Sequence, residues 1–161
     1  MKPGSKCFTS QSSFDAWFGD DSRVWVTELT FKFNPVTGNH EFDSTNYVPL
    51  TGKGCDNKNR FVKDSKRGRP ASQGNGLFTS EIALFFRYNG GEVFDFRGDD
   101  SVWVFVDYKL ALDIGGCHGP IAGKISLDSL NLNVGQQYAL HIYHAEECVR
   151  CPQLRITGML D

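Results

Sequence analysis

Residues 82–96 read Ile-Ala-Leu-Phe-Phe-Arg-Tyr-Asn-Gly-Gly-Glu-Val-Phe-Asp-Phe, and this stretch decides the fold class. Every second residue from Ile82 to Tyr88 is large and mainly apolar, which is the period of a β-strand. Asn89-Gly90-Gly91 follows and favours a hairpin turn, because glycine adopts the positive φ angles of tight turns at no steric cost. The turn leads into a second predicted strand at residues 93–96.

The same strand-like patterning extends in both directions from this stretch. Residues 102–106 form a continuous apolar run, as expected for a strand buried on both faces. A short turn at Asp107-Tyr108 connects this run to an alternating strand at residues 110–114. Upstream, residues 24–33 alternate with a phase slip at Thr27-Glu28, which predicts a bulged strand. Further strands are predicted around residues 125–127, 138–142 and 154–156.

Eight or more short strands with turn signals between them predict an all-β fold, either an antiparallel β-sandwich or a barrel. The chain of 161 residues has the size of one domain, so we assign residues 1–161 to a single domain. Its formal net charge of −2 gives no general attraction to nucleic acid or anionic membranes. The sequence contains no apolar run long enough to span a membrane. Residues 1–5 lack a signal-peptide core, so a secreted origin would make this a mature or excised segment.

A basic stretch at residues 51–76 interrupts the strand pattern. Six of the 17 basic residues lie between positions 58 and 69 of this stretch, which is predicted to be a surface loop. A solvated loop and a patch for acidic polysaccharide both fit this composition. Nucleic acid is disfavoured, because Phe61 is the only aromatic residue among the charges. The six basic residues are Lys58, Arg60, Lys63, Lys66, Arg67 and Arg69.

Two adjacent carboxylates, Asp99 and Asp100, follow Gly98 at the start of the apolar run. Strand geometry sends neighbouring side chains to opposite faces, so one shared site requires a distorted backbone, for example a cis peptide. Ca²⁺ prefers six to eight hard oxygen ligands, and two carboxylates also neutralise its charge. The alternative is a turn in which Asp99 caps exposed amides and Asp100 faces water.

The cysteines admit several chemistries. Their number is five, so at least one has no disulfide partner within the chain. The Cys148-x-x-Cys151 pair fits a loop disulfide, a zinc site completed by Cys117 and His118, or a redox motif. A redox motif requires a helix that begins directly after a strand, and the sequence predicts none there.

The sequence does not predict an enzyme. Asp99 and Asp100 are adjacent, whereas the two carboxyl groups of a glycosidase face each other across the scissile bond. A Gly-x-Ser-x-Gly elbow, a phosphate-binding glycine loop and a His-Glu-x-x-His motif are all absent from the sequence.

Residues 98–119 resemble the signature of the fibro-slime domain. They read Gly-Asp-Asp-Ser-Val-Trp-Val-Phe-Val-Asp-Tyr-Lys-Leu-Ala-Leu-Asp-Ile-Gly-Gly-Cys-His-Gly. The resemblance continues through residues 125–132, 135–138 and 143–146, and upstream matches extend it over essentially the whole chain. This family belongs to the PA14 group of extracellular β-sandwich modules, so the resemblance implies a PA14-like sandwich. The extracellular setting that it implies favours the disulfide among the cysteine alternatives.

The resemblance also implies a metal site. PA14-like lectin domains hold Ca²⁺ through two adjacent aspartates joined by a cis peptide, and the cation binds vicinal sugar hydroxyls. Asp99 and Asp100 match that pair. Such adhesins place other ligands on the loop between the last two strands, here residues 146–153. Candidate ligand-binding residues in this loop are Glu146, Glu147, Arg150 and Gln153.

His118 also belongs to the matched block. It is either a hydrogen-bonded structural residue or the wall of a sugar site beside Asp113.

The resulting expectation is an extracellular, calcium-dependent carbohydrate-binding module of an adhesin or lectin type, which acts as part of a larger protein. Its partner would be a glycan whose terminal sugar carries vicinal hydroxyls. The alternative is a non-catalytic assembly domain of a matrix or surface protein, with an extracellular protein as partner.

Overall fold

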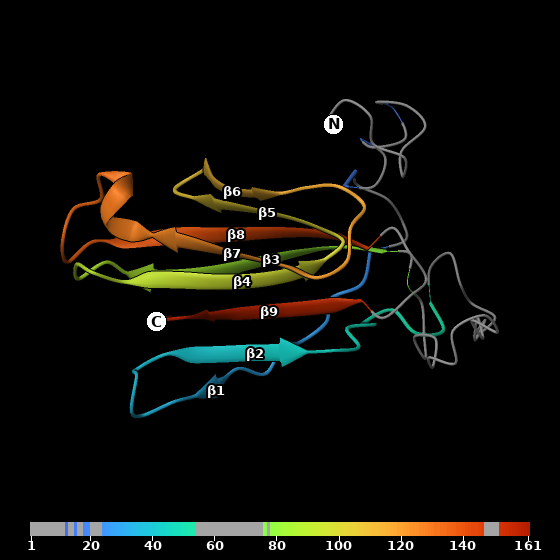
Figure 1. Ribbon diagram of the computed structural model, residues 1–161, viewed down its shortest axis with the longest axis horizontal. Coiled ribbons are helices and arrows are strands. Elements are labelled where there is room, and N and C mark those ends of the chain that lie inside the picture. The colour runs from blue at the N-terminus through green and yellow to red at the C-terminus, as the bar shows by residue number, and fades with distance from the viewer. Residues whose placement is uncertain are drawn as a thin grey trace.

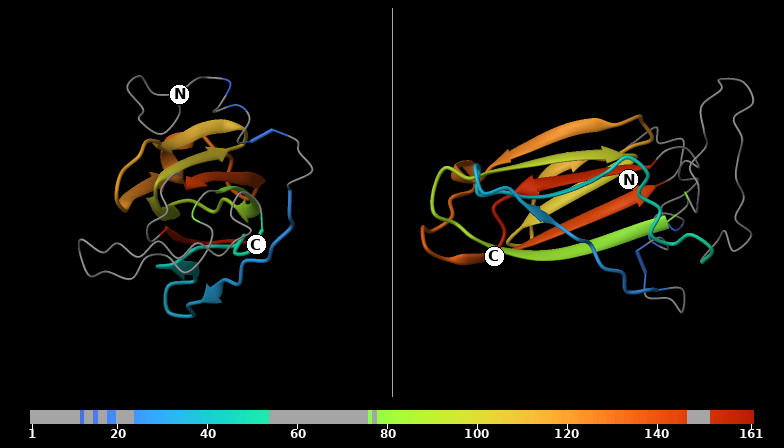
Figure 2. Two further views of the ribbon diagram at one scale, coloured as in Figure 1. Left: turned by 90° about the vertical axis from the view of Figure 1, so that its right-hand side faces the viewer. Right: turned by 90° about the horizontal axis from the view of Figure 1, so that it is seen from below.

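The computed structural model describes residues 12, 15, 18–19, 24–53, 76, 78–146 and 152–161. Within these residues, the chain forms two antiparallel sheets that face each other as a β-sandwich and do not close into a barrel. Figures 1 and 2 show the strands of both sheets running along the long axis of the molecule. The predicted all-β class is therefore confirmed.

One sheet has five strands in the order β1-β2-β9-β4-β7, and the other has four in the order β3-β8-β5-β6. The first comprises β1 (Lys32–Phe33), β2 (His40–Ser44), β9 (Gln153–Gly158), β4 (Val93–Asp99) and β7 (Ile121–Ser126). The second comprises β3 (Phe78–Arg87), β8 (Gln137–Glu146), β5 (Ser101–Val106) and β6 (Lys109–Ile114). A short 3₁₀ helix, η1 (Leu127–Leu130), follows β7.

The core lies between the sheets and follows the two-residue period of the strands. In β9 and β4, every second side chain is buried, including Leu154, Ile156, Phe94 and Phe96. The facing sheet contributes aliphatic side chains that are equally buried. These are Val102, Val104 and Val106 from β5 and Leu140 and Ile142 from β8.

The structure corrects the predicted hairpin at Asn89-Gly90-Gly91. The two flanking strands, β3 and β4, belong to different sheets, so this turn carries the chain across the sandwich. The Glu92 carboxylate accepts hydrogen bonds from the backbone N–H groups of Asn89 (2.7 Å) and Gly90 (2.9 Å). An alternating pattern specifies which face of a strand is buried but not which strand lies beside it, so the sequence could not distinguish the two arrangements.

Two further strand predictions need correction. Only Lys32–Phe33 of the predicted strand at residues 24–33 is a strand, and Val24 and Val26 of the apolar pattern are exposed to solvent. In β5, only one face is fully buried. Trp103 and Phe105 lie on the outer face, where both are partly exposed. Both side chains are large and apolar, so the sequence of residues 102–106 is continuously apolar although the outer face is partly exposed.

The predicted turn at Asp107-Tyr108 is confirmed. It joins β5 to β6 as a two-residue hairpin, and both residues have positive φ angles, 49° and 61°. Nearly all of the basic stretch at residues 51–76 lies outside the described residues, and its surface role stays a prediction.

The close approach of Gly158 to Phe94 gives a test of the packing. A Cβ atom at Gly158 would overlap the fully buried Phe94 ring. We expect Gly158→Ala to lower the free energy of unfolding by about 1–3 kcal/mol, because the core cannot absorb the added atom. The measurement is urea denaturation. Gly119→Ala is the control, since a Cβ there meets no atom within 4 Å; equal stability of the two variants would contradict this account.

Candidate functional site

The adjacent carboxylates lie where the chain passes from one sheet to the other. Asp99 ends β4 in the five-stranded sheet, and Ser101 begins β5 in the four-stranded sheet. The Asp99–Asp100 peptide bond is cis, which is the departure from regular strand geometry that the sequence predicted. Asp99 is 8% exposed and Asp100 is 1% exposed, so the alternative in which Asp100 faces water is wrong.

Gly98 is required by the packing of this crossing. A Cβ atom at this position would overlap the side chain of Val102 and lie 3.6 Å from the carbonyl oxygen of Asp100. The absence of a side chain therefore lets the β4–β5 connection fold back closely onto the first residues of β5.

The β6–β7 connection, which lies at this end of the sandwich (Figure 1), contacts Asp100 through its backbone. The backbone N–H of His118 donates a hydrogen bond to Asp100 Oδ1 at 3.0 Å. Beside it, the backbone N–H of Gly116 donates to Ser101 Oγ at 2.9 Å. Both ring nitrogens of His118 lie near backbone carbonyls, Nδ1 at 2.8 Å from Gly119 O and Nε2 at 3.1 Å from Ile114 O. These contacts orient the His118 ring.

Asp99 is held from the opposite side by β8. His144 Nε2 lies 3.1 Å from the carbonyl oxygen of Asp99, and a hydrogen bond there requires the tautomer that carries its proton on Nε2. His144 is fully buried, and its ring packs against Tyr47 and Phe78 at centroid distances of 5.7 and 5.6 Å. The sequence offered no reason to associate His144 with the aspartates, because a lone histidine in a strand is not diagnostic.

Burial shifts the pKa values of Asp99 and His144. Desolvation, reinforced by the neighbouring Asp100 charge, raises the pKa of Asp99 to about 6, although His118 opposes the shift. Desolvation also lowers the pKa of His144 to about 4, so this imidazole is neutral at pH 7. The site therefore places carboxylate charge in a poorly solvated position. A bound cation would stabilise that charge.

Strand register brings two other candidate residues to the same end of the sandwich. Gln153 lies opposite Asp99 in the β4–β9 pair. Glu146 is buried and ends β8, one residue beyond Ala145, which lies opposite Ser101. Glu147 and Arg150 lie outside the described residues, as does the Cys148–Cys151 pair. Asp113 is in register with Trp103 instead, and it is exposed, with its carboxylate accepting the N–H of Gly115 at 2.8 Å.

A complete metal-ligand set is not present among the residues that the structure describes. Within them, no group of three or more His, Cys, Asp or Glu side chains is arranged to hold a metal ion. Asp99 and Asp100 supply hard oxygen atoms of the kind that Ca²⁺ prefers, but Ca²⁺ requires further oxygen ligands.

The described residues also contain no helix that is long and apolar enough to cross a membrane.

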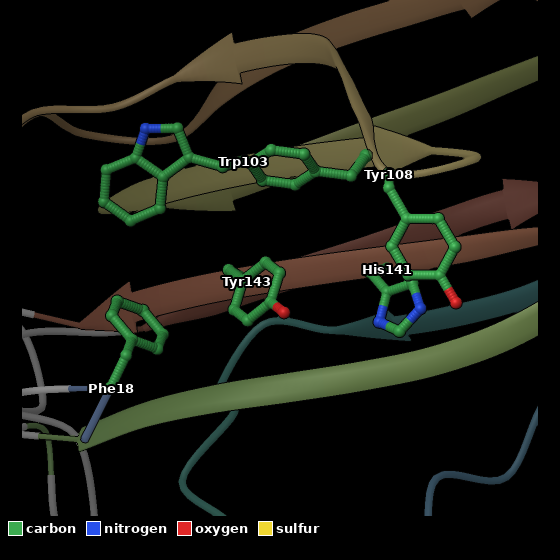
Figure 3. Close-up of a pocket in the computed structure, with 6 residues that line it drawn as sticks. Phe18, Trp103, Tyr108, His141 and Tyr143 are labelled. Carbon is green, nitrogen blue, oxygen red and sulfur yellow. The ribbon is translucent and has the colours of Figure 1, made fainter.

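A second feature, which the sequence did not predict, is an aromatic groove on the outer face of the four-stranded sheet. Its cavity volume is about 400 Å³, and Figure 3 shows the side chains that line it. The available signal was the regular alternation of valine with large rings along β5, which separates a buried face from an aromatic one. The lining residues are Phe18, Trp103, Phe105, Tyr108, His141 and Tyr143.

The shifts of Asp99 and His144 predict opposite pH effects on stability. The raised pKa of Asp99 makes the folded state bind the proton more tightly, so its contribution to stability falls as pH rises from about 4 to about 6. The lowered pKa of His144 makes its contribution rise between about pH 4 and 6.5. In the metal-free protein the two contributions oppose each other, and we expect a shallow pH profile.

Single substitutions should separate these contributions. Asp99→Asn should make the free energy of unfolding rise by on the order of 2 kcal/mol between pH 4 and 6.5, and His144→Gln should make it fall. Urea denaturation in EDTA across this range measures both slopes. Asp107→Asn, at an exposed turn, should keep the shallow profile. Parallel profiles for the Asp99 and His144 variants would show that these groups do not govern the pH dependence.

Comparison with known proteins finds relatives in Dictyostelium discoideum. The chain is 34% identical to protein psiC over 157 residues, which is 94% of this chain and 30% of psiC. It is 34% identical to protein psiD over 156 residues, with the same two coverages of 94% and 30%. With protein psiB it shares 33% identity over 121 residues, covering 74% of the chain and 21% of psiB.

No protein-family model matches the chain, and no solved structure matches it. The chain spans less than a third of the length of psiC, psiD and psiB, so it is similar to one part of each of these Dictyostelium proteins.

Proposed function

We propose that this chain is a calcium-dependent carbohydrate-binding module, resembling PA14-type lectins and without catalytic activity. The observation that carries the proposal is the pair of adjacent, buried carboxylates at Asp99 and Asp100. The backbone N–H of His118 donates to Asp100 Oδ1, and His144 Nε2 lies 3.1 Å from the backbone carbonyl of Asp99. These contacts orient the segment, but neither supplies a formal positive charge to balance the carboxylates. A divalent cation would neutralise their negative charge.

Asp99 and Asp100 would hold the Ca²⁺, and the loop that joins β8 to β9 would supply further oxygens. Gln153 supports this assignment, because its register places it beside Asp99 at the start of β9. Glu146, Glu147 and Arg150 remain candidates in the same loop, and His118 would form a wall of the site. When bound, Ca²⁺ would offer coordination positions to two neighbouring hydroxyls of a terminal sugar.

An extracellular location is part of the proposal. Cys117 is disulfide-bonded, and this supports an oxidising compartment, where disulfides persist. The limited coverage of the psi proteins supports the expectation that the chain is one module of a longer protein. A single sugar site makes few contacts, so repeated modules would be needed for strong attachment.

The alternative is a structural module that binds an extracellular protein. Two observations favour it: the described residues contain no complete set of metal ligands, and exposed apolar side chains lie on the outer face of the four-stranded sheet. Phe85 and Leu110 are each more than half exposed there. In that case, any calcium would only rigidify the β8–β9 loop.

The metal site is tested by calcium titration. We expect Ca²⁺ to release or absorb measurable heat and to raise the melting temperature, because binding to the folded state stabilises it. Asp99→Asn combined with Asp100→Asn should abolish both effects by removing the two charged ligands. The control is Asp95→Asn, a carboxylate on the same strand that pairs with Lys124 at 3.0 Å. Unchanged calcium binding in the double variant would exclude this site.

The ligand class is tested on a glycan array. We expect binding of a subset of glycans in Ca²⁺ that is lost in EDTA and lost in the double Asp99/Asp100 variant, because the cation contacts the sugar directly. Sedimentation of the same samples measures self-association. Calcium binding without glycan binding, together with concentration-dependent self-association, would reject the lectin function in favour of assembly.

A further inference from the structure

The aromatic groove is built by residues that are far apart in the sequence. Strand register places Trp103 opposite Tyr143 and Phe105 opposite His141 in the β5–β8 pair. Tyr108, at the tip of the β5–β6 hairpin, closes one end with its ring 5.5 Å from that of His141. Figure 3 shows these side chains along one face of the sheet, with Phe18 at the other end.

Several rings in the groove meet at right angles. Phe18 lies edge-on to Trp103 and Tyr143, with interplanar angles of 80° and 82° and centroid distances of 6.2 and 5.6 Å. Phe105 and Tyr143 are also perpendicular, at 87° and 5.7 Å. The Tyr108 ring at the end of the groove is 78% exposed, so it is accessible to a ligand. The faces of aromatic rings carry the negative part of the ring quadrupole.

Acidic side chains lie on both sides of this aromatic surface. Glu81 is opposite Tyr143 in the β3–β8 pair, and its Oε1 accepts the Tyr143 hydroxyl at 3.1 Å and lies 3.5 Å from His141 Nδ1. Asp113 is opposite Trp103 in the β5–β6 pair. One transverse row of the sheet therefore runs from Asp113 through Trp103 and Tyr143 to Glu81, with a carboxylate at each end. None of the six lining residues is a lysine or an arginine.

From this juxtaposition we propose that the groove binds an organic cation, specifically an alkylated ammonium group such as a trimethylammonium or a methylated lysine. Ring faces attract such a cation electrostatically, and its methyl groups bury apolar surface that a bare ammonium lacks. Glu81 and Asp113 supply the complementary charge. The groove lies on the sheet face away from the core, so this proposal is independent of the calcium site.

The test compares choline with 3,3-dimethyl-1-butanol, its neutral analogue in which carbon replaces the quaternary nitrogen. Titrations are made on the whole chain in EDTA and followed by the NMR signal of the Trp103 indole N–H. We expect choline to bind at least about fivefold more tightly than the neutral analogue. Equal affinity for choline and 3,3-dimethyl-1-butanol would show that the groove is a non-specific apolar site and would overturn the proposal. Binding of methyl glucoside without choline, or no shift with choline, would also overturn the proposal.

Two substitutions identify the contributing groups. Trp103→Leu keeps an apolar side chain but removes the π face, and we expect choline binding to weaken about tenfold. Glu81→Gln keeps an acceptor for the Tyr143 hydroxyl while removing the charge, and we expect a loss of about threefold or more. The matched control is Glu41→Gln, which alters an exposed carboxylate that accepts the Thr157 hydroxyl at 3.2 Å on the other sheet.

The position of Glu81 keeps the test decisive. This side chain is 55% exposed, so its replacement should leave the fold intact even where the loss of Trp103 does not. Melting temperatures of all variants verify folding. Wild-type affinity for choline in the Glu81→Gln variant would contradict the charge complementarity on which the proposal depends.

Discussion

The candidate calcium site depends on one geometric constraint, the crossing from β4 to β5 while both strands remain buried. The crossing is made by Gly98, Asp99 and Asp100. Gly98 has no side chain, which permits close packing against β5, and the next two residues are buried carboxylates. The crossing places charged groups where solvent is scarce, so hydrogen bonds from the flanking segments are needed to orient them. The architecture and the chemistry of this end of the sandwich therefore arise from the same residues.

The sequence predicted the all-β class and the hairpin at Asp107-Tyr108, because both depend on local residue order. The cis peptide between Asp99 and Asp100 was expected only if both carboxylates served one site, as the family resemblance implied. The sequence did not predict which strands are neighbours. β3 and β4 flank a glycine turn but join different sheets, since apolar alternation is satisfied on either side of the core. His144 was missed for a related reason: its contact with Asp99 joins residues 45 positions apart.

The two proposed sites use opposite physical environments. At the sheet crossing, both carboxylates are buried, and desolvation is the largest cause of the raised pKa of Asp99. On the outer face of β5 and β8, partly exposed rings line the groove, and the carboxylates of Glu81 and Asp113 are exposed to solvent. If both proposals hold, a hard inorganic ion and an organic cation would bind in chemically different surroundings as well as at different positions.

The strand order of the five-stranded sheet also constrains how the protein is made. β9 lies between β2 and β4, and its register joins Phe42 to Ile156, residues distant in the sequence. During synthesis, β2 therefore leaves the ribosome long before the strand that covers its inner edge. Until residues 153–158 emerge, that edge is open to pairing with other chains. Pairing between strands so far apart in the sequence slows folding, and an unpaired strand edge favours association with other chains.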